Sequence, residues 1–338
     1  MPEKPFHTPA PALPRELTRY RALSPLAGIH VFPIQLGAMS IRDKRHVHGM
    51  GAKDKEASFK LLNAYYDKGG NFIDTSCDYQ DGSSEAFLGE WMETRGVRDR
   101  IILATRVGID DDTAHIINYG GNHIKNLRLS VEGSLKKLRT SYIDILYVHW
   151  WDWATSVKEV MDSLHNLVVA GKVLYLGVSD TPAWVISKAN QYANDHGKTP
   201  FAIYQGHWNV LDRTFEREFI PMARRVALAP FGVLGSERLR SDAPDVKRRT
   251  RKAEWKRDEK ERAVSNVLKE IGKEVGTEHI TAVAVAYVMH EAPYVFPIIG
   301  GRKVEHLLAN LDALKISLTP EHIKRIESVG SFQPESSS

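Results

Sequence analysis

Four side chains that can move or orient a proton lie at or just after apolar runs in the first half of the chain. Asp74 is in the run NFIDT, Tyr79 lies just beyond it, Arg106 interrupts the run ILATRVG, and His149 ends IDILYVH. A phenol has an ordinary pKa of about 10, so a fixed cation beside it makes its proton easier to move. A carboxylate can orient that cation, and an imidazole can orient a carbonyl oxygen or share the proton.

Each of these side chains also has an ordinary structural explanation when it is taken singly. An aspartate at a strand end is often a cap, and a tyrosine or histidine in such a run is often part of the core. Arg106 is different, because burying an unpaired guanidinium is costly. Either it points to solvent, or something at the end of its strand needs a fixed positive charge.

The elements that position these residues follow an alternating pattern. Short apolar runs typical of buried strands occur at 34–39, 71–75, 100–107, 143–149, 173–179, 202–208, 227–232 and 295–301. The segments between them have helical periodicity. One covers 53–70 and stops at a Gly-Gly pair, and another covers 156–172 and opens on Ser156 with the spacing of a capping box.

Eight strands alternating with helices predict a parallel sheet, and eight repeats of about 30 residues favour closure into a single-domain α/β fold, the (β/α)8 TIM barrel. An open doubly wound sheet is the alternative, but no G-x-G-x-x-G follows the first strand. The expected organisation is an irregular N-terminal arm at 1–25, the barrel at 26–330 with long loops at 108–123 and 236–262, and a flexible tail at 331–338.

The composition is that of an ordinary globular protein. The 338 residues are 42% hydrophobic and 26% charged, and the net charge of +4 is too small to argue for a nucleic acid or membrane partner. Cys77 is the only cysteine, which excludes an intrachain disulfide and a cysteine-based metal site. No apolar run approaches a membrane span, and the proline-rich start is not a secretory signal, so the cytoplasm is the expected compartment.

In a parallel barrel, polar residues at the C-terminal ends of the strands converge on one mouth. The later strands contribute Ser179 and Asp180, then Gln205, then Phe231. Their joint placement with the first four residues favours a functional site over eight unrelated structural roles.

The stretch GGNFIDTSCDYQDGSSEAFLGEWM at 69–92 resembles the aldo-keto reductase signature. The resemblance covers roughly residues 25–330, and the wording WWDW, SDTPAW and YQGHWNVLDR is similar to the fungal aryl-alcohol dehydrogenase and norsolorinic acid reductase-like branch. It implies NAD(P)H-dependent interconversion of a carbonyl and an alcohol. It further implies that Tyr79 is the general acid, that Asp74 orients the cation and that His149 orients the carbonyl.

The resemblance also implies a set of cofactor-binding positions, and Asp74 belongs to this set as well as to the catalytic one. Ser179, Asp180 and Gln205 would meet the nicotinamide carboxamide, with Phe231 stacked on the ring. The pyrophosphate and adenosine phosphate would lie against Gly232, Leu234, Gly301, Arg302, Lys303, His306 and Asn310. A helix N-terminus suits a phosphate, and the basic pair 302–303 favours NADP(H) over NAD(H). The alternative is two solvated basic residues on a surface helix.

The clearest departure from the family pattern is Arg106, where the family normally has lysine. Arginine is planar, larger and always charged. It can pair with Asp74 through two hydrogen bonds, but it can also crowd Tyr79. We therefore hypothesise that reductase activity is weakened or that its substrate range is altered.

Three functions remain open from the sequence. The first is an NADPH-dependent reductase of aromatic or other hydrophobic aldehydes and ketones, for which the aromatic residues at 150–153 and Trp208 could offer a flat surface. Those residues could equally be packing residues. The second is a non-redox acid–base catalyst, such as a dehydratase or isomerase, on the same barrel. The third is a nucleotide-binding homologue without catalysis. The natural substrate, reaction direction and oligomeric state stay open.

Overall fold

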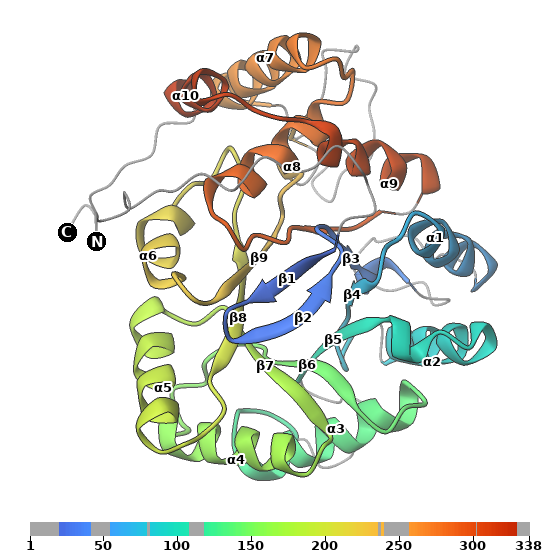
Figure 1. The fold of residues 1–338 in the computed structure, drawn as a ribbon, viewed down its shortest axis with the longest axis vertical. Coiled ribbons are helices and arrows are strands. Elements are labelled where there is room, and N and C mark those ends of the chain that lie inside the picture. The colour runs from blue at the N-terminus through green and yellow to red at the C-terminus, as the bar shows by residue number, and fades with distance from the viewer. Residues whose placement is uncertain are drawn as a thin grey trace.

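The computed structural model describes residues 20–41, 55–79, 82–107, 118–235, 238–239, 257–301 and 303–329. Its centre is a sheet of parallel strands that forms the barrel at the middle of Figure 1. In spatial order the strands are β10 (Ile298–Ile299), β3 (Gln35–Gly37), β4 (Phe72–Asp74), β5 (Ile102–Val107), β6 (Ile143–Val148), β7 (Val173–Ser179), β8 (Phe201–His207) and β9 (Ala227–Phe231).

β9, the last strand of this order, closes the barrel against the segment that leads into β10, the first strand. Leu228 in β9 forms a parallel bridge with Val295. Its N–H donates to the Tyr294 carbonyl at 2.7 Å, and its carbonyl accepts from the Phe296 N–H at 2.8 Å. The prediction of a (β/α)8 barrel with eight parallel strands is therefore confirmed, although the run predicted at 295–301 contains only two strand residues.

Helices alternate with the strands and surround them (Figure 1). They are α1 (Lys55–Asp67), α2 (Ser83–Arg95), α3 (Ile124–Lys137), α4 (Val157–Val169), α5 (Ala183–Asp195), α6 (Phe215–Met222), α7 (Glu259–Glu274), α8 (Ile280–Glu291), α9 (Val304–Leu311) and α10 (Pro320–Val329). The predicted start of α4 is confirmed, because the Ser156 hydroxyl accepts from the Glu159 N–H at 3.2 Å. In a full capping box the Glu159 carboxylate would accept from the Ser156 N–H. Here it accepts from the Ile124 N–H of α3 instead.

The prediction of an irregular arm up to residue 25 is wrong for its last residues. β1 (Arg21–Ser24) pairs antiparallel with β2 (Ala27–Val31) to form a hairpin. Its side chains Leu23, Ala27 and Val31 are buried in one cluster with inward-facing barrel residues such as Phe72 and Phe296. Figure 1 shows this hairpin lying across the barrel. It closes the end of the barrel at which the strands begin, and apolar burial is what orders it. Residues 1–19 lie outside the described part of the chain.

The long loop predicted at 236–262 ends earlier than expected. α7 begins at Glu259, and Asp258 and Glu261 form a complete capping box with hydrogen bonds of 2.7 and 2.9 Å. Two orphan backbone N–H groups are thereby satisfied, which fixes the helix start. Most of this loop, the first ten residues of the loop at 108–123, and the tail at 331–338 lie outside the described residues.

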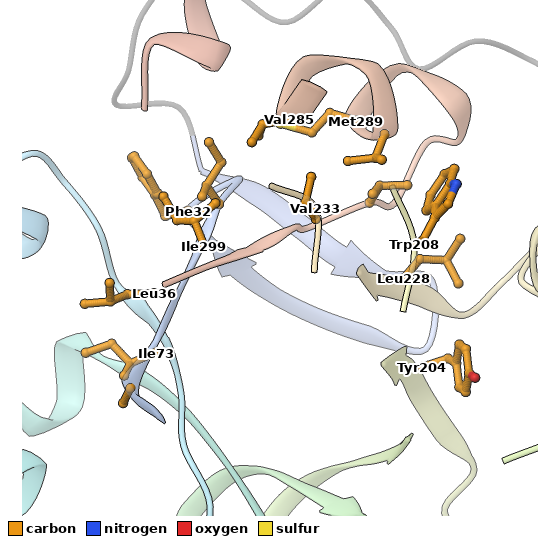
Figure 2. Close-up of a cluster of buried hydrophobic side chains, with 14 of the residues drawn as sticks. Phe32, Leu36, Ile73, Tyr204, Trp208, Leu228, Val233, Val285, Met289 and Ile299 are labelled. Carbon is orange, nitrogen blue, oxygen red and sulfur yellow. The ribbon is translucent and has the colours of Figure 1, made fainter. Parts of the chain in front are cut away.

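The main hydrophobic core fills the layer between the strands and the helices. Figure 2 shows Val285 and Met289 of α8 beside Val233 and Ile299 from the barrel side. α8 is buried nearly all round, since α7 covers it and α10 packs on α7. Among the described residues, no helix combines the length and apolar character needed to cross a membrane.

Three carboxylates gather where α6, α8 and α10 meet, and one arginine pairs with two of them. Glu216 of α6, Glu291 of α8 and Glu327 of α10 approach within 4.8 Å of one another. Arg213 donates to Glu216 at 2.7 Å and to Glu327 at 2.5 Å. Burial raises the pKa of Glu291 to about 8, with a further contribution from the two neighbouring carboxylates.

This raised pKa predicts that stability falls as the pH rises. Between about pH 4.5 and about pH 8 the unfolded chain releases the Glu291 proton while the folded chain retains it, so the contribution to stability is present at low pH and lost above the folded pKa. We expect Glu291→Gln to match the natural protein at about pH 5 and to be more stable by on the order of 2 kcal/mol at about pH 9. Urea unfolding at the two pH values measures this, and an equal difference at both would contradict it.

Candidate active site

Strand alternation directs the candidate residues into the barrel. Arg106 in β5 lies directly opposite Tyr147 in β6, and Ser179 in β7 lies opposite Gln205 in β8. Directly opposed residues of neighbouring strands point to the same face. The predicted residues on these strands therefore face one interior, at the C-terminal end of the barrel, where enzymes of this fold place their chemistry.

Arg106 is buried and joins two other candidates. One of its terminal nitrogens, Nη1, donates to the Tyr79 hydroxyl at 2.8 Å. The other, Nη2, forms a hydrogen bond and an ion pair with Asp74 Oδ1. The same carboxylate oxygen accepts from the Gln205 amide at 2.9 Å. The Arg106 guanidinium therefore does not point to solvent, and it is buried together with its partners.

The ionisation of this group follows from burial and from the pairing. Burial raises the pKa of Asp74, and the Arg106 charge opposes that rise. Burial also raises the pKa of Tyr79 to about 12, although Arg106 pulls it down. Burial acts to lower the pKa of Arg106, but Asp74 and Tyr79 together hold it above its usual value. The phenol therefore keeps its proton at neutral pH beside a permanent cation.

The loop after β4 holds Tyr79 over this cation. The Thr75 N–H donates to the Ala104 carbonyl at 2.8 Å, and the Cys77 N–H donates to the Arg106 carbonyl at 3.4 Å. Lys137 of α3 donates to the Cys77 carbonyl at 3.0 Å and forms an ion pair with a fully buried glutamate of α2, Glu85. The loop is thus anchored to β5 and to two helices, and this fixes the position of the phenol.

His149 follows β6 and lies at the edge of the same site. Burial, helped by the Arg106 charge, lowers the pKa of its imidazole to about 4. The ring is therefore neutral near pH 7 and carries one N–H. Within the described residues its Nδ1 makes no hydrogen bond, and the carboxylate of Asp78 lies 3.9 Å away. A neutral imidazole here can donate to a carbonyl oxygen.

Tyr147 is a site residue that the sequence analysis missed. Its ring faces Arg106, with the guanidinium carbon 5.8 Å from the ring centre. A Cβ at Gly177 would lie 2.6 Å from this ring, so the glycine makes room for it. Tyr147 is fully buried whereas Tyr79 is partly exposed, so only Tyr79 can meet a substrate. The sequence could have indicated Tyr147, because it lies two residues before His149. Side chains two residues apart on a strand point to the same face of the sheet.

The positions expected near a nicotinamide lie along β7, β8 and β9. Ser179 is buried at the end of β7, and the exposed Asp180 has a left-handed φ of 39°. Its N–H donates to the Gln205 carbonyl at 3.3 Å. Gln205 therefore links Asp74 to the β7 turn, and the structure brings Ser179, Asp180 and Gln205 together.

Phe231 ends β9 with its ring 5.6 Å from that of His207. Gly232 follows with φ of 69°, and its carbonyl accepts from the Asn209 amide at 3.1 Å. Asn209 was not predicted, although a buried asparagine just after a strand is a common turn-former. Leu234 packs partly buried against the hydrophobic core.

The expected phosphate-binding segment lies between β10 and α9. Lys303 is the N-cap of α9 and makes no side-chain capping bond, so the first N–H groups of the helix stay available. A Cβ at Gly301 would meet nothing closer than 4.0 Å, which leaves open space beside that helix end. Lys303 and His306 are exposed, and Asn310 is buried on the next turn. Arg302 lies outside the described residues. These features fit a phosphate group.

The aromatic residues proposed for a substrate surface divide into two groups. Trp208 is fully buried, stacks on Phe215 at 5.0 Å and donates to Glu216 at 3.0 Å. Its interpretation as a surface for a substrate ring is wrong, and the packing alternative is correct. Trp151 is also buried, whereas Trp150 and Trp153 are exposed.

Comparison with known proteins identifies the class. A model described as the aldo/keto reductase family matches residues 33–331. The chain is 54% identical over 335 residues to an aryl-alcohol dehydrogenase (NADP+) of Phanerodontia chrysosporium, with 94% of this chain and 87% of the relative covered. It is 51% identical over 338 residues to a putative aryl-alcohol dehydrogenase of Saccharomyces cerevisiae, with 96% and 90% covered.

A third relative is a norsolorinic acid reductase of Aspergillus flavus, 49% identical over 330 residues, with 96% of this chain and 84% of the relative covered. The chain therefore belongs to the aldo/keto reductase family of oxidoreductases.

Proposed function

We propose that the protein is an NADP(H)-dependent oxidoreductase that interconverts aromatic or other hydrophobic aldehydes or ketones and the corresponding alcohols. The observation that carries this is the hydrogen-bonded chain from Asp74 through Arg106 to Tyr79. The names of the relatives support the same chemistry. A cytoplasmic location and a role in fungal secondary metabolism stay predictions.

The proposed chemistry assigns one role to each side chain. The cofactor, when bound, supplies or accepts the hydride. Tyr79 donates a proton to the carbonyl oxygen as it becomes an alcohol, and Arg106 stabilises the phenolate that is left. Asp74 holds Arg106 in place. The neutral imidazole of His149 donates to the same carbonyl oxygen and orients it.

The residues of this chain that would hold the cofactor form two groups. Ser179, Asp180 and Gln205 would face the carboxamide of the nicotinamide, and Phe231 would cover its ring. The second group would hold the phosphates, with Gly232 and Leu234 at the pyrophosphate and Gly301, Arg302, Lys303, His306 and Asn310 around the adenosine phosphate. Two basic residues in the sequence, Arg302 and Lys303, favour the extra phosphate of NADPH.

Steady-state assays of the purified protein test this proposal. Fluorescence titration with NADPH and with NADH measures cofactor binding and preference. A panel of benzaldehydes and aromatic ketones then measures NADPH oxidation. We expect tighter binding of NADPH and turnover of aromatic aldehydes. Binding without turnover would favour a non-catalytic homologue, and conversion of a substrate without NADPH oxidation would favour a dehydratase or isomerase.

We further propose that Arg106 weakens the reaction relative to a lysine at the same place. A guanidinium stays charged, cannot share a proton with Tyr79, and fills more space beside it than an ammonium. We expect Arg106→Lys to reduce aromatic aldehydes at least about threefold faster in kcat/KM than the natural protein. Agreement within about twofold, which is roughly 0.4 kcal/mol of barrier, would show that the arginine is no handicap.

The same roles predict different pH dependences for the two directions. His149, with a pKa of about 4, stays neutral and Tyr79, with a pKa of about 12, stays protonated across the neutral range. We expect kcat for aldehyde reduction to change less than about twofold between about pH 6 and about pH 9. Alcohol oxidation needs the phenolate and should rise roughly tenfold per pH unit. A reduction rate that titrates near pH 6.5 would contradict the neutral role of His149.

A further inference from the structure

A layer of buried polar side chains lies behind Asp74 and Arg106, on the side of the strands that faces α2. Thr75 follows Asp74 and Thr105 precedes Arg106, and neighbouring residues of a strand point to opposite faces. Because Arg106 faces the interior of the barrel, the Thr105 hydroxyl faces outward, and it donates to Glu85 Oε1 of α2 at 2.7 Å. Thr75, Thr105 and Glu85 are all fully buried. Polar side chains are rarely buried this deeply unless they are hydrogen-bonded.

Ser84 of α2 belongs to the same layer and is also fully buried. Its hydroxyl lies 2.9 Å from the Thr75 hydroxyl and donates to the Ala38 carbonyl at 3.0 Å. Its N–H donates to the Tyr79 carbonyl at 3.4 Å. The start of α2 is therefore fixed both to the end of the strand that carries Asp74 and to the loop that carries Tyr79.

The buried carboxylate of Glu85 has its cation in Lys137, the last residue of α3. Lys137 Nζ lies 3.0 Å from Glu85 Oε2 and donates to the Cys77 carbonyl at 3.0 Å. Without this ammonium the Glu85 charge would be buried and uncompensated, so the pairing holds the ammonium closely in place. Lys137 thereby joins a buried anion to the backbone of the loop, two residues before Tyr79.

The backbone of Cys77 is held through both of its polar groups. Its N–H donates to the Arg106 carbonyl at 3.4 Å, and its carbonyl accepts from Lys137. The first of these hydrogen bonds is long and therefore weak, whereas a charged donor makes the second one stronger. The Tyr79 N–H donates to the Ser76 carbonyl at 3.3 Å, so the turn beside Cys77 leads directly to the phenol. Lys137 is therefore the stronger of the two anchors of this turn.

We propose that Lys137 is a positioning residue for the reduction, which holds the Tyr79 loop against Arg106 through the Cys77 carbonyl and is itself held by Glu85. The inference rests on the proposed function, and it adds a residue of α3 on which the chemical step depends. Displacing a reacting group by about 1 Å can cost about 10²-fold in rate. Loosening this loop should therefore slow the proton transfer and leave binding nearly unchanged.

Single-turnover oxidation of bound NADPH by benzaldehyde tests this role. Lys136→Met is the matched control for Lys137→Met, because Lys136 precedes it in α3 and is exposed. We expect Lys137→Met to lower the limiting rate about 10²-fold, and to change the half-saturating benzaldehyde concentration and the Kd of NADPH by less than about twofold. The control should match the natural protein. An unchanged limiting rate in folded Lys137→Met would overturn the proposal.

A double variant separates the hydrogen bond to Cys77 from the balance of charge at Glu85. Lys137→Met alone leaves the Glu85 carboxylate buried without its cation, which can prevent folding. Lys137→Met combined with Glu85→Gln removes both charges, and the glutamine can still accept from the Thr105 hydroxyl. We expect this variant to fold and still to be about 10²-fold slow, because the Cys77 carbonyl lacks its donor. A rate restored to that of the natural protein would show that Lys137 only balances Glu85, which would overturn the proposal.

Hydrogen exchange of the Cys77 amide separates the failure of this proposal from the failure of the proposed function, because it needs no substrate. We expect exchange at least about tenfold faster in both Lys137 variants than in the natural protein and in Lys136→Met, since the loop opens more readily. If no aldehyde is reduced but exchange behaves this way, Lys137 holds the loop and the proposed reaction fails. Equal exchange in all the proteins would overturn the proposal whatever the activity.

Discussion

Replacing Tyr79 by phenylalanine is expected to lower kcat for aldehyde reduction by about 10²- to 10⁴-fold, the range that a positioned general acid contributes. The substitution removes one oxygen, which accepts from Arg106 at 2.8 Å, and leaves the ring in place. Single-turnover oxidation of bound NADPH by benzaldehyde measures the chemical step. NADPH affinity, followed by fluorescence, should change little, because no proposed cofactor-binding residue is altered.

Two outcomes would contradict the role of Tyr79. A fall of less than about tenfold would show that another group or water supplies the proton. A parallel loss of NADPH binding would show that the change disturbed the whole site. The neighbouring Tyr147→Phe is the matched control, since Tyr147 also flanks Arg106 but is fully buried. It should retain most of the activity.

Replacing Arg106 by methionine is expected to destabilise the protein by about 3–5 kcal/mol, because it leaves the buried Asp74 carboxylate without its cation. Activity should fall by at least about 10²-fold, since the phenolate of Tyr79 loses its stabilising charge. Urea unfolding measures the first effect. The rate of aldehyde reduction, measured without urea at a temperature at which the variant is folded, gives the effect on activity.

A double variant separates the two effects of Arg106. Arg106→Met combined with Asp74→Asn removes both charges, and replacing a buried pair costs much less than breaking it. Stability should therefore recover by most of the loss, whereas activity should not recover. If activity returned together with stability, the cation would have only a structural role. If stability failed to return, the ion pair would not explain the loss.

The sequence predicted the barrel and much of the site for one physical reason. Side chains alternate along a strand, and parallel strands bring their C-terminal ends to one edge. Asp74, Arg106 and His149 could therefore be grouped from their positions in apolar runs. Tyr79 could be added from its place just beyond the same strand as Asp74, and the family motif assigned its role as the general acid, but its contacts depend on the loop that β5 and α3 hold in place.

Other features could not be predicted because they depend on tertiary packing. The strands of the N-terminal hairpin are four and five residues long. They are ordered only by the burial of residues such as Leu23 against inward-facing residues of the barrel. Trp208 and Trp153 are both tryptophans after a strand, yet one is fully buried and the other is 65% exposed. Sequence periodicity does not separate them, because the difference comes from tertiary contacts. Asp152 accepts from the backbone N–H groups after Trp153, whereas the Trp208 indole donates to Glu216.

The proposed reaction is the transfer of a hydride between NADP(H) and an aromatic carbonyl carbon. The most direct measurement uses NADPH carrying deuterium at the transferable C4 position, an aromatic aldehyde and the natural protein, followed by mass and proton spectra of the alcohol. We predict one deuterium on the carbinol carbon for each NADPH oxidised. An alcohol without deuterium at that carbon, or a product formed while the NADPH remains reduced, would contradict it.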